Sequence, residues 1–171
     1  MKNIIKDLYP YVIIIIVVLL FKKFIVSPIR VIGPSMKDTL RDKDIMILDK
    51  VSYRFSDIKR FDIVVIKYEN DYIIKRIIGL PGDKVECINS KLYINDKLQE
   101  EKYIVPGTET TNFTVKSINN TETIPKGYYL VLGDNREESK DSRAIGLIKK
   151  NMIEGKAKLT IFPFSRIGIK K

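Results

Sequence analysis

The sequence predicts a mainly β domain behind a single N-terminal transmembrane helix, and three observations lead to this fold class. A long apolar stretch lies close to the N-terminus. The rest of the chain contains short runs rich in Ile and Val that are separated by turn residues. No later segment shows the apolar period of a long amphipathic helix. With 171 residues, of which 44% are hydrophobic, the chain can form one folded domain with an appendage.

The apolar stretch covers residues 8–21 and is interrupted only by Pro10. As a helix, these 14 residues would span about 21 Å, which is less than the roughly 30 Å of a hydrocarbon core. Extension to Val26 gives 19 residues and about 28 Å. This extension requires the side chains of Lys22 and Lys23 to reach the interface.

A cleavable secretory signal is the alternative interpretation of the same stretch. The residues that follow it are Lys-Lys-Phe-Ile-Val-Ser-Pro, which do not resemble an Ala-x-Ala cleavage site. We therefore expect an uncleaved tail and anchor over residues 1–26 and a β-rich domain over residues 27–171.

Short strands follow the anchor, and two pairs of them are predicted to form hairpins because turn residues separate the partners. The expected strands are 45–48, 62–68, 72–78, 84–88, 92–94, 128–132 and 156–162. The hairpins pair 62–68 with 72–78 and 84–88 with 92–94. The polar segment 106–123 is expected to be a long loop or a weak strand pair.

The charge of the chain indicates an anionic partner, because the net charge is +10 and the sequence pI is about 9.5. Nucleic acid and a lipid surface both fit that description. The basic residues are spread along the chain without interleaved aromatic residues, so we expect the lipid bilayer as partner and no nucleic acid.

The chain contains no histidine, and Cys87 is its only cysteine. These two facts exclude a Ser-His-Asp triad, a Cys-His pair, an intramolecular disulfide and any zinc site that needs imidazole. A hydrolase with this composition must use a carboxylate, a lysine or a terminal amine as its base. We expect no metal and no cofactor.

Ser35 is the candidate nucleophile because it lies in a tight turn between an apolar and a charged run. Gly33 permits backbone angles that other residues resist, and Pro34 fixes one dihedral just before the serine. Such a turn can hold a hydroxyl in a fixed direction. An ordinary turn serine gives the same pattern.

Lys75 is the candidate base, since it lies between Ile73 and Ile77 on one face of an expected strand. Burial of an ammonium group among apolar side chains lowers its pKa, and a neutral lysine amine can accept a proton from a serine hydroxyl. A solvated strand edge is the alternative position for Lys75.

Four segments, in this order, resemble motifs of the bacterial type I signal peptidases. They are Gly-Pro-Ser-Met at 33–36, Phe-Asp-Ile-Val-Val at 61–65, the segment 75–83 that begins Lys-Arg, and the segment 133–143 that begins Gly-Asp-Asn-Arg. The resemblance covers nearly the whole chain. It implies a membrane-anchored serine protease that removes signal peptides from exported proteins.

The resemblance also implies catalytic roles. Ser35 would be the nucleophile, and Lys75 would be the general base and then the acid for the leaving amine. The Ser35 N–H would be one oxyanion donor. Gly33 stands where some family members have a second donor hydroxyl, so its backbone or a water would have to serve. Ser139 matches the residue that orients the lysine.

Asp141 and Arg143 match an ion pair that supports the site in the family. Asp134 and Arg76 are expected to form another. Solvated loop charges of little energetic value are the alternative. Asp38 departs from the family, which usually has proline at this position, so the turn after the nucleophile would be less rigid.

The implied partners are signal-peptide-bearing preproteins with small residues, typically alanine, at the first and third positions before the cut. Branched side chains near the nucleophile would leave room only for small ones. The candidate pocket residues are Ile29, Val31, Leu40 and Ile74. The family further implies a single-pass protein of the cell membrane with a cytoplasmic N-terminus and an extracytoplasmic catalytic domain. The distribution of lysine and arginine around the anchor does not decide this orientation.

Three other classes of protein share part of this pattern. Self-cleaving repressor-type proteases share Ser-Lys chemistry, but they are cytosolic and carry a DNA-binding domain. A sortase would use Cys87 and would need a histidine. A non-catalytic, membrane-anchored β domain remains the main competitor, and peptide cleavage distinguishes it from an enzyme.

Overall fold

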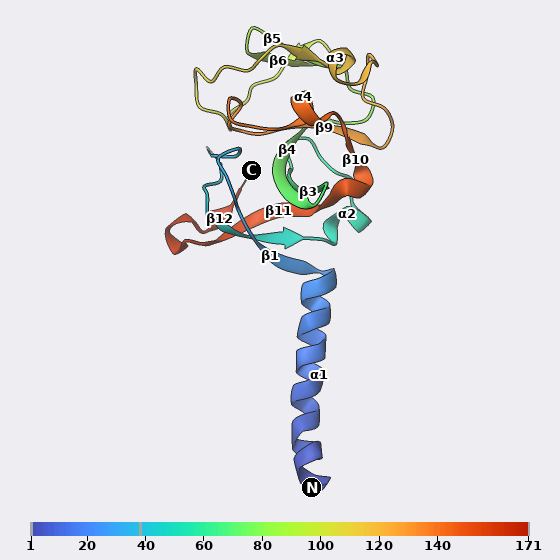
Figure 1. Ribbon diagram of the computed structural model, residues 1–171, viewed down its shortest axis with the longest axis vertical. Helices are drawn as coiled ribbons and strands as arrows, with labels where there is room; N and C mark the ends of the chain where they lie inside the picture. The colour runs from blue at the N-terminus through green and yellow to red at the C-terminus, as the bar shows by residue number, and fades with distance from the viewer. Residues whose placement is uncertain (1, 38, 171) are drawn as a thin grey trace.

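The structure, a computed structural model, describes residues 2–37 and 39–170. Asp38, and with it the expected loosening of the turn, lies outside the described residues, as do the side chains of Lys22 and Lys23. The N-terminal helix α1 (Lys2–Phe24) projects from a body made almost entirely of strands (Figure 1). The prediction of a mainly β domain is therefore confirmed.

Helix α1 begins earlier and ends earlier than the expected anchor. Its large apolar side chains between Leu8 and Leu20 are 40–66% exposed. Within the part of the chain that the structure describes, no helix is both long and apolar enough to cross a membrane. The predicted extension of the helix to Val26 is wrong, because Val26 begins strand β1. Pro28 contributes to this boundary, since the residue before a proline disfavours helical angles.

Eight antiparallel strands form the main sheet, in the order β1-β2-β11-β3-β4-β9-β10, with β12 paired to β11. Their bounds are β1 (Val26–Arg30), β2 (Ile45–Asp49), β3 (Ile63–Tyr68), β4 (Asp71–Gly79), β9 (Tyr128–Leu132), β10 (Ile148–Lys149), β11 (Ile153–Phe162) and β12 (Gly168–Ile169). The predicted hairpin of 62–68 and 72–78 is confirmed as the β3–β4 pair.

Four strands form a smaller sheet at the end of the molecule opposite α1 (Figure 1). They are β5 (Val85–Ile88), β6 (Lys91–Ile94), β7 (Lys97–Leu98) and β8 (Phe113–Thr114). The predicted hairpin of 84–88 and 92–94 is confirmed as β5–β6. The polar segment 106–123 differs from the prediction, because β8 pairs with β5 and is followed by a short helix.

The helices of the body are all short and lie between strands. They are α2 (Ser52–Phe55), α3 (Val115–Asn119), α4 (Ser142–Ile145) and the 3-10 turns η1 (Lys150–Met152) and η2 (Phe164–Arg166). Thr114 caps α3 by accepting the Ser117 N–H in a capping box, a local signal in a segment that the sequence left unassigned.

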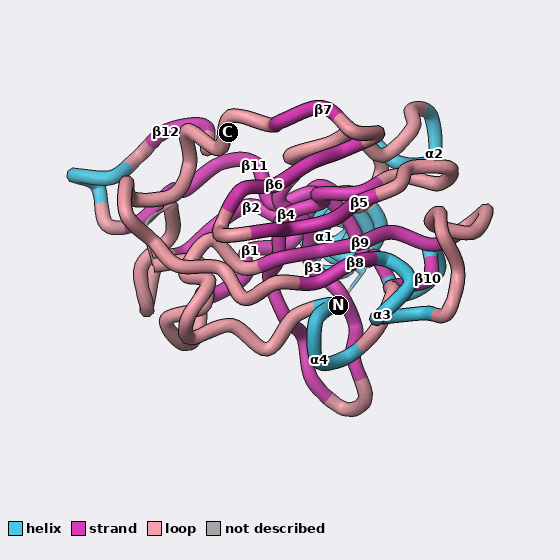
Figure 2. The backbone as a smooth tube through the Cα atoms, turned by 90° about the horizontal axis from the view of Figure 1, so that it is seen from above, coloured by secondary structure: helices cyan, strands magenta, loops and turns pink. Residues whose placement is uncertain are grey.

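Two parts of the core fix the surroundings of the candidate site. One cluster packs the small sheet onto β4 and β9 through residues such as Leu92 and Leu130. Figure 2 shows the strands of the small sheet running over those of the main sheet. A second cluster joins β2 and β3 to the turn that carries Ser35, through Met36, Leu40 and Met46. The site therefore lies where apolar packing holds a turn against the main sheet.

Candidate active site

The turn that carries Ser35 is held by its neighbours on both sides. Gly33 has a φ of +85°, a conformation that glycine adopts without strain, and its N–H donates to Asp42 Oδ1 at 3.1 Å. Met36 and Leu40 follow the serine and are 1% and 0% exposed. The turn is thereby anchored in the core and leaves the serine at its surface.

Ser35 and Lys75 meet although they are 40 residues apart in the chain. Lys75 Nζ lies 2.8 Å from Ser35 Oγ and donates to the Ile74 carbonyl at 3.0 Å. The lysine is only 3% exposed. Burial lowers its pKa to about 8, against the opposing effect of the carboxylates of Asp141 and Asp134, which raise it.

This geometry suits proton transfer between the two groups. When Lys75 is charged, it donates to the serine oxygen. When it is neutral, its lone pair can accept the hydroxyl proton at the same separation. A pKa near 8 gives a substantial neutral fraction in mildly alkaline solution.

Gly133 lies between Ser35 and Ser139, and only glycine fits there. A Cβ at this position would lie 2.2 Å from Ser139 Oγ and 2.5 Å from the Ser35 carbonyl oxygen. The Asn135 N–H donates to that carbonyl at 3.1 Å. The loop 133–141 is thus packed directly against the nucleophile turn. Among the described residues, the buried Ser139 Oγ makes no hydrogen bond of ordinary geometry, although it lies near enough to Asp141 to help lower the pKa of that carboxyl. Its predicted contact with Lys75 is not formed.

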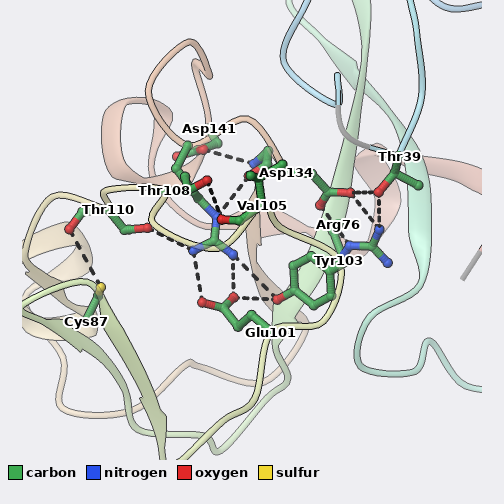
Figure 3. A network of polar contacts seen from close by, with 12 residues as sticks. Thr39, Arg76, Cys87, Glu101, Tyr103, Val105, Thr108, Thr110, Asp134 and Asp141 are labelled. Atoms are coloured by element: carbon green, nitrogen blue, oxygen red, sulfur yellow. Dashed lines mark hydrogen bonds and ion pairs between the residues drawn. The ribbon is translucent and has the colours of Figure 1, made fainter.

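Arg76 and Asp134 form a fully buried ion pair beside the site (Figure 3). Arg76 Nε donates to Asp134 Oδ1 at 2.8 Å, and Nη2 donates to Oδ2 at 2.6 Å. The Thr39 hydroxyl donates to Asp134 Oδ2 at 2.5 Å. Through Thr39, the pair also contacts the nucleophile turn. The sequence did not assign this role to the threonine.

Asp141 and Arg143 form a second ion pair at the start of α4. Arg143 Nε and Nη2 each donate to one oxygen of Asp141 at 2.9 Å, and the Gly133 N–H donates to Oδ2 at 3.0 Å. Burial raises the pKa of Asp141, but the hydrogen bonds from Arg143 and Gly133 outweigh it and hold the pKa below its ordinary value. The carboxylate is therefore charged at neutral pH.

A cleft of about 610 Å³ extends from the Ser35 and Lys75 side chains between β1 and the first half of β4. Three of the four candidate pocket residues line it, namely Ile29, Val31 and Ile74. Leu40 does not line this cleft, and the expectation for it is wrong, because it is fully buried in the core beneath the turn.

The N–H of Gly33 does not serve as an oxyanion donor in this conformation, since it already donates to Asp42. In the part of the chain that the structure describes, no group of three or more acidic or cysteine side chains could hold a metal ion.

Two residues that approach the site network were missed from the sequence. Glu101 and Tyr103 lie between β7 and β8 and both contact Arg136. The Tyr103 ring also lies against Arg76 (Figure 3). No periodicity or motif marks them, because their segment has no regular secondary structure.

The fold and the site are those of a serine peptidase, and sequence comparison supports this class. The chain matches the family described as signal peptidase, peptidase S26, over residues 3–162. It belongs to this family.

Two relatives and one crystal structure that are similar to this chain are all signal peptidases. The chain is 40% identical to signal peptidase IB of Staphylococcus aureus over 96% of this chain and 92% of the relative. It is 37% identical to signal peptidase I of Bacillus caldolyticus over 94% and 92% of the two chains. A crystal structure of a signal peptidase I from Enterococcus faecalis matches with a TM-score of 0.54 and 37% identity, covering 59% of this chain and 97% of that one.

Proposed function

We propose that this enzyme removes N-terminal signal peptides from exported preproteins, cutting after small residues with a Ser35–Lys75 dyad. The observation that carries the proposal is the 2.8 Å separation of Lys75 Nζ and Ser35 Oγ, with the lysine almost entirely buried. The family membership supports the reaction class.

In the proposed mechanism, neutral Lys75 takes the proton of the Ser35 hydroxyl as the oxygen attacks the scissile carbonyl carbon. The resulting oxyanion accepts a hydrogen bond from the Ser35 N–H. Lys75, now an ammonium, gives its proton to the leaving amine of the mature protein. A water then attacks the acyl-enzyme, and Lys75 accepts its proton and returns it to Ser35.

The residues around the dyad are proposed to position it. Ser139 Oγ packs against Gly133 beside the nucleophile turn and interacts with Asp141, so it would hydrogen-bond Lys75 after a change of rotamer on substrate binding. The pairs Arg76–Asp134 and Asp141–Arg143 fix the two ends of the loop on which Ser139 lies.

The cleft is proposed to bind the extended end of the signal peptide. β1 is an edge strand, and the first half of β4 pairs only with β3, so both offer main-chain groups to an added strand. Ile29, Val31 and Ile74 narrow the cleft near Ser35. Side chains of this size exclude large residues at the first and third positions before the cut.

We also propose that α1 anchors the enzyme in the cell membrane in a single pass, with the N-terminus cytoplasmic and the domain 27–171 outside. The 23 residues of α1 reach about 35 Å. Its exposed apolar side chains from Leu8 to Leu20 would be covered by lipid. The small sheet, at the opposite end of the molecule, would then lie farthest from the bilayer (Figure 1).

The dyad predicts the effect of two substitutions and of pH on cleavage of a signal-bearing precursor in detergent. Ser35→Ala and Lys75→Ala should each lower kcat/KM by at least about 1,000-fold while the protein stays folded.

In the wild type, kcat/KM should rise about tenfold per pH unit below pH 8 and level off above it, because only the neutral amine of Lys75, whose pKa is about 8, acts as base.

The matched control is Lys67→Ala, which removes an exposed lysine from neighbouring β3 and should leave the rate unchanged. A folded Lys75→Ala protein that keeps its rate would contradict the dyad. A wild type that cleaves no precursor would favour the non-catalytic binding domain.

The cleft predicts a change of specificity on substitution of Ile29. Ile29→Ala widens the cleft, so kcat/KM for a precursor with valine or leucine at the third position before the cut should rise about tenfold relative to alanine. Ile88→Ala removes an exposed isoleucine from the small sheet and serves as the control. An unchanged ratio would place that substrate position elsewhere.

Anchoring predicts the behaviour of the full chain in bacterial membranes. Alkaline carbonate washing should leave the protein in the membrane fraction, and protease added outside the cells should digest the domain. Release by carbonate would contradict the anchor, and protection from protease would contradict the orientation.

A further inference from the structure

A buried cluster outside the dyad joins the small sheet to the loop that packs on Ser35. It consists of Glu101 and Tyr103, between β7 and β8, and Arg136, within the loop 133–141. We call these three residues the Arg136 clamp. Figure 3 shows the side chains of Glu101 and Tyr103 meeting beside the Arg76–Asp134 pair.

The charges of the clamp are almost entirely withdrawn from water. The side chains of Arg136 and Glu101 are 0% and 6% exposed. Arg136 Nη1 donates to Glu101 Oε2 at 3.2 Å, and Nη2 donates to Oε1. The Tyr103 hydroxyl donates to the same Oε1 at 2.5 Å. Two-point pairing of this kind fixes the direction of both side chains as well as their separation.

The other side of Arg136 holds the backbone of the catalytic loop. Its Nε donates to the Gly133 carbonyl at 3.0 Å, and its own carbonyl accepts from Arg143 Nη2 at 2.6 Å. Gly133 is the residue that packs between Ser35 and Ser139. Arg136 therefore connects Glu101 to the backbone that sets the distance between the nucleophile turn and Ser139.

Tyr103 adds a contact to the second support of the site. The guanidinium carbon of Arg76 lies 4.2 Å from the centroid of the Tyr103 ring. A cation over an aromatic face is attracted by the ring, most strongly where water is excluded. One short segment thus touches both Arg136 and Arg76.

We propose that Glu101 and Tyr103 are positioning residues of the peptidase, which act through Arg136 to hold the loop 133–141 in its catalytic position. This inference rests on the proposed function. Removal of the Glu101 charge leaves a buried guanidinium without its anion, which favours a rearrangement of Arg136 and of the loop attached to it.

The test is Glu101→Gln, which keeps the size of the side chain but removes its charge and one acceptor oxygen. The matched control is Glu122→Gln, which makes the same change in an ion pair with Lys116 where both side chains are more than 60% exposed. Precursor cleavage gives kcat and KM. Amide hydrogen exchange gives the placement of the loop without any need for catalysis.

Glu101→Gln should lower kcat about tenfold and change KM by less than about twofold, because the dyad is misplaced while the cleft is intact. The amides of Gly133 and Asn135, which bond to Asp141 and to the Ser35 carbonyl, should exchange about tenfold faster. The amide of Ile77, which bonds to the Asp62 carbonyl outside the loop, should not change. Glu122→Gln should match the wild type throughout.

Equal kcat and equal exchange in Glu101→Gln and wild type would overturn the proposal. An equal acceleration at Ile77 would also overturn it, because the effect would then be global stability. A wild type that cleaves nothing while the loop amides respond would refute the proposed function and leave the clamp as a support of the loop.

If Glu101→Gln does not fold, the same two measurements on Tyr103→Phe test the proposal. This substitution removes only the hydroxyl that donates to Glu101 and keeps the ring against Arg76. We expect a fall in kcat of about threefold with faster exchange at Gly133 and Asn135. Wild-type values for both would overturn the proposal.

Discussion

The burial of one amine beside one hydroxyl is the constraint on which the rest of this structure depends. In water a lysine is charged and cannot accept a proton, so the chain must exclude water from Lys75 to make it a base. The strands β3 and β4 place the lysine in the body, and the packing of Met36 and Leu40 brings Ser35 to it. Burial lowers the pKa of Lys75 to about 8, although nearby carboxylates oppose the change.

The carboxylates of Asp134 and Asp141 form buried ion pairs beside the dyad. These pairs fix the geometry of the site more than they stabilise the fold. A buried ion pair costs desolvation that can exceed its Coulomb attraction, so Arg76–Asp134 need not stabilise the fold. Two-point hydrogen bonding instead fixes the side chains in one arrangement. Thr39 links that pair to the nucleophile turn, and Gly133 lets the loop approach within contact of Ser35. Together, the ion pairs, Thr39 and Gly133 enclose the dyad on the side away from the cleft.

The strands that could be predicted from the sequence are those marked by residues close to one another in the chain. The apolar runs rich in strand-forming residues became β2, β3, β4 and β9, because residue type and flanking turn residues act over a few positions. β1 was missed because Pro28 hid its strand pattern, and an edge strand tolerates proline. The end of α1 was placed too late because the apolar residues up to Val26 continue the pattern of the anchor. Leu40 was assigned to the cleft because its neighbours line the site, whereas its side chain turns into the core. The roles of Glu101 and Tyr103 could not be predicted from the sequence, because only tertiary folding brings them to Arg136.

The central claim is that Lys75 is neutral at the pH at which the enzyme works. The most direct measurement is an NMR titration of the lysine side chains in the folded, full-length protein, with Lys75 assigned by its loss in Lys75→Met. The account predicts a Lys75 midpoint near 8, well below the ordinary value of a lysine side chain. A Lys75 midpoint at that ordinary value would contradict the account, because a permanently charged amine cannot take the proton of Ser35.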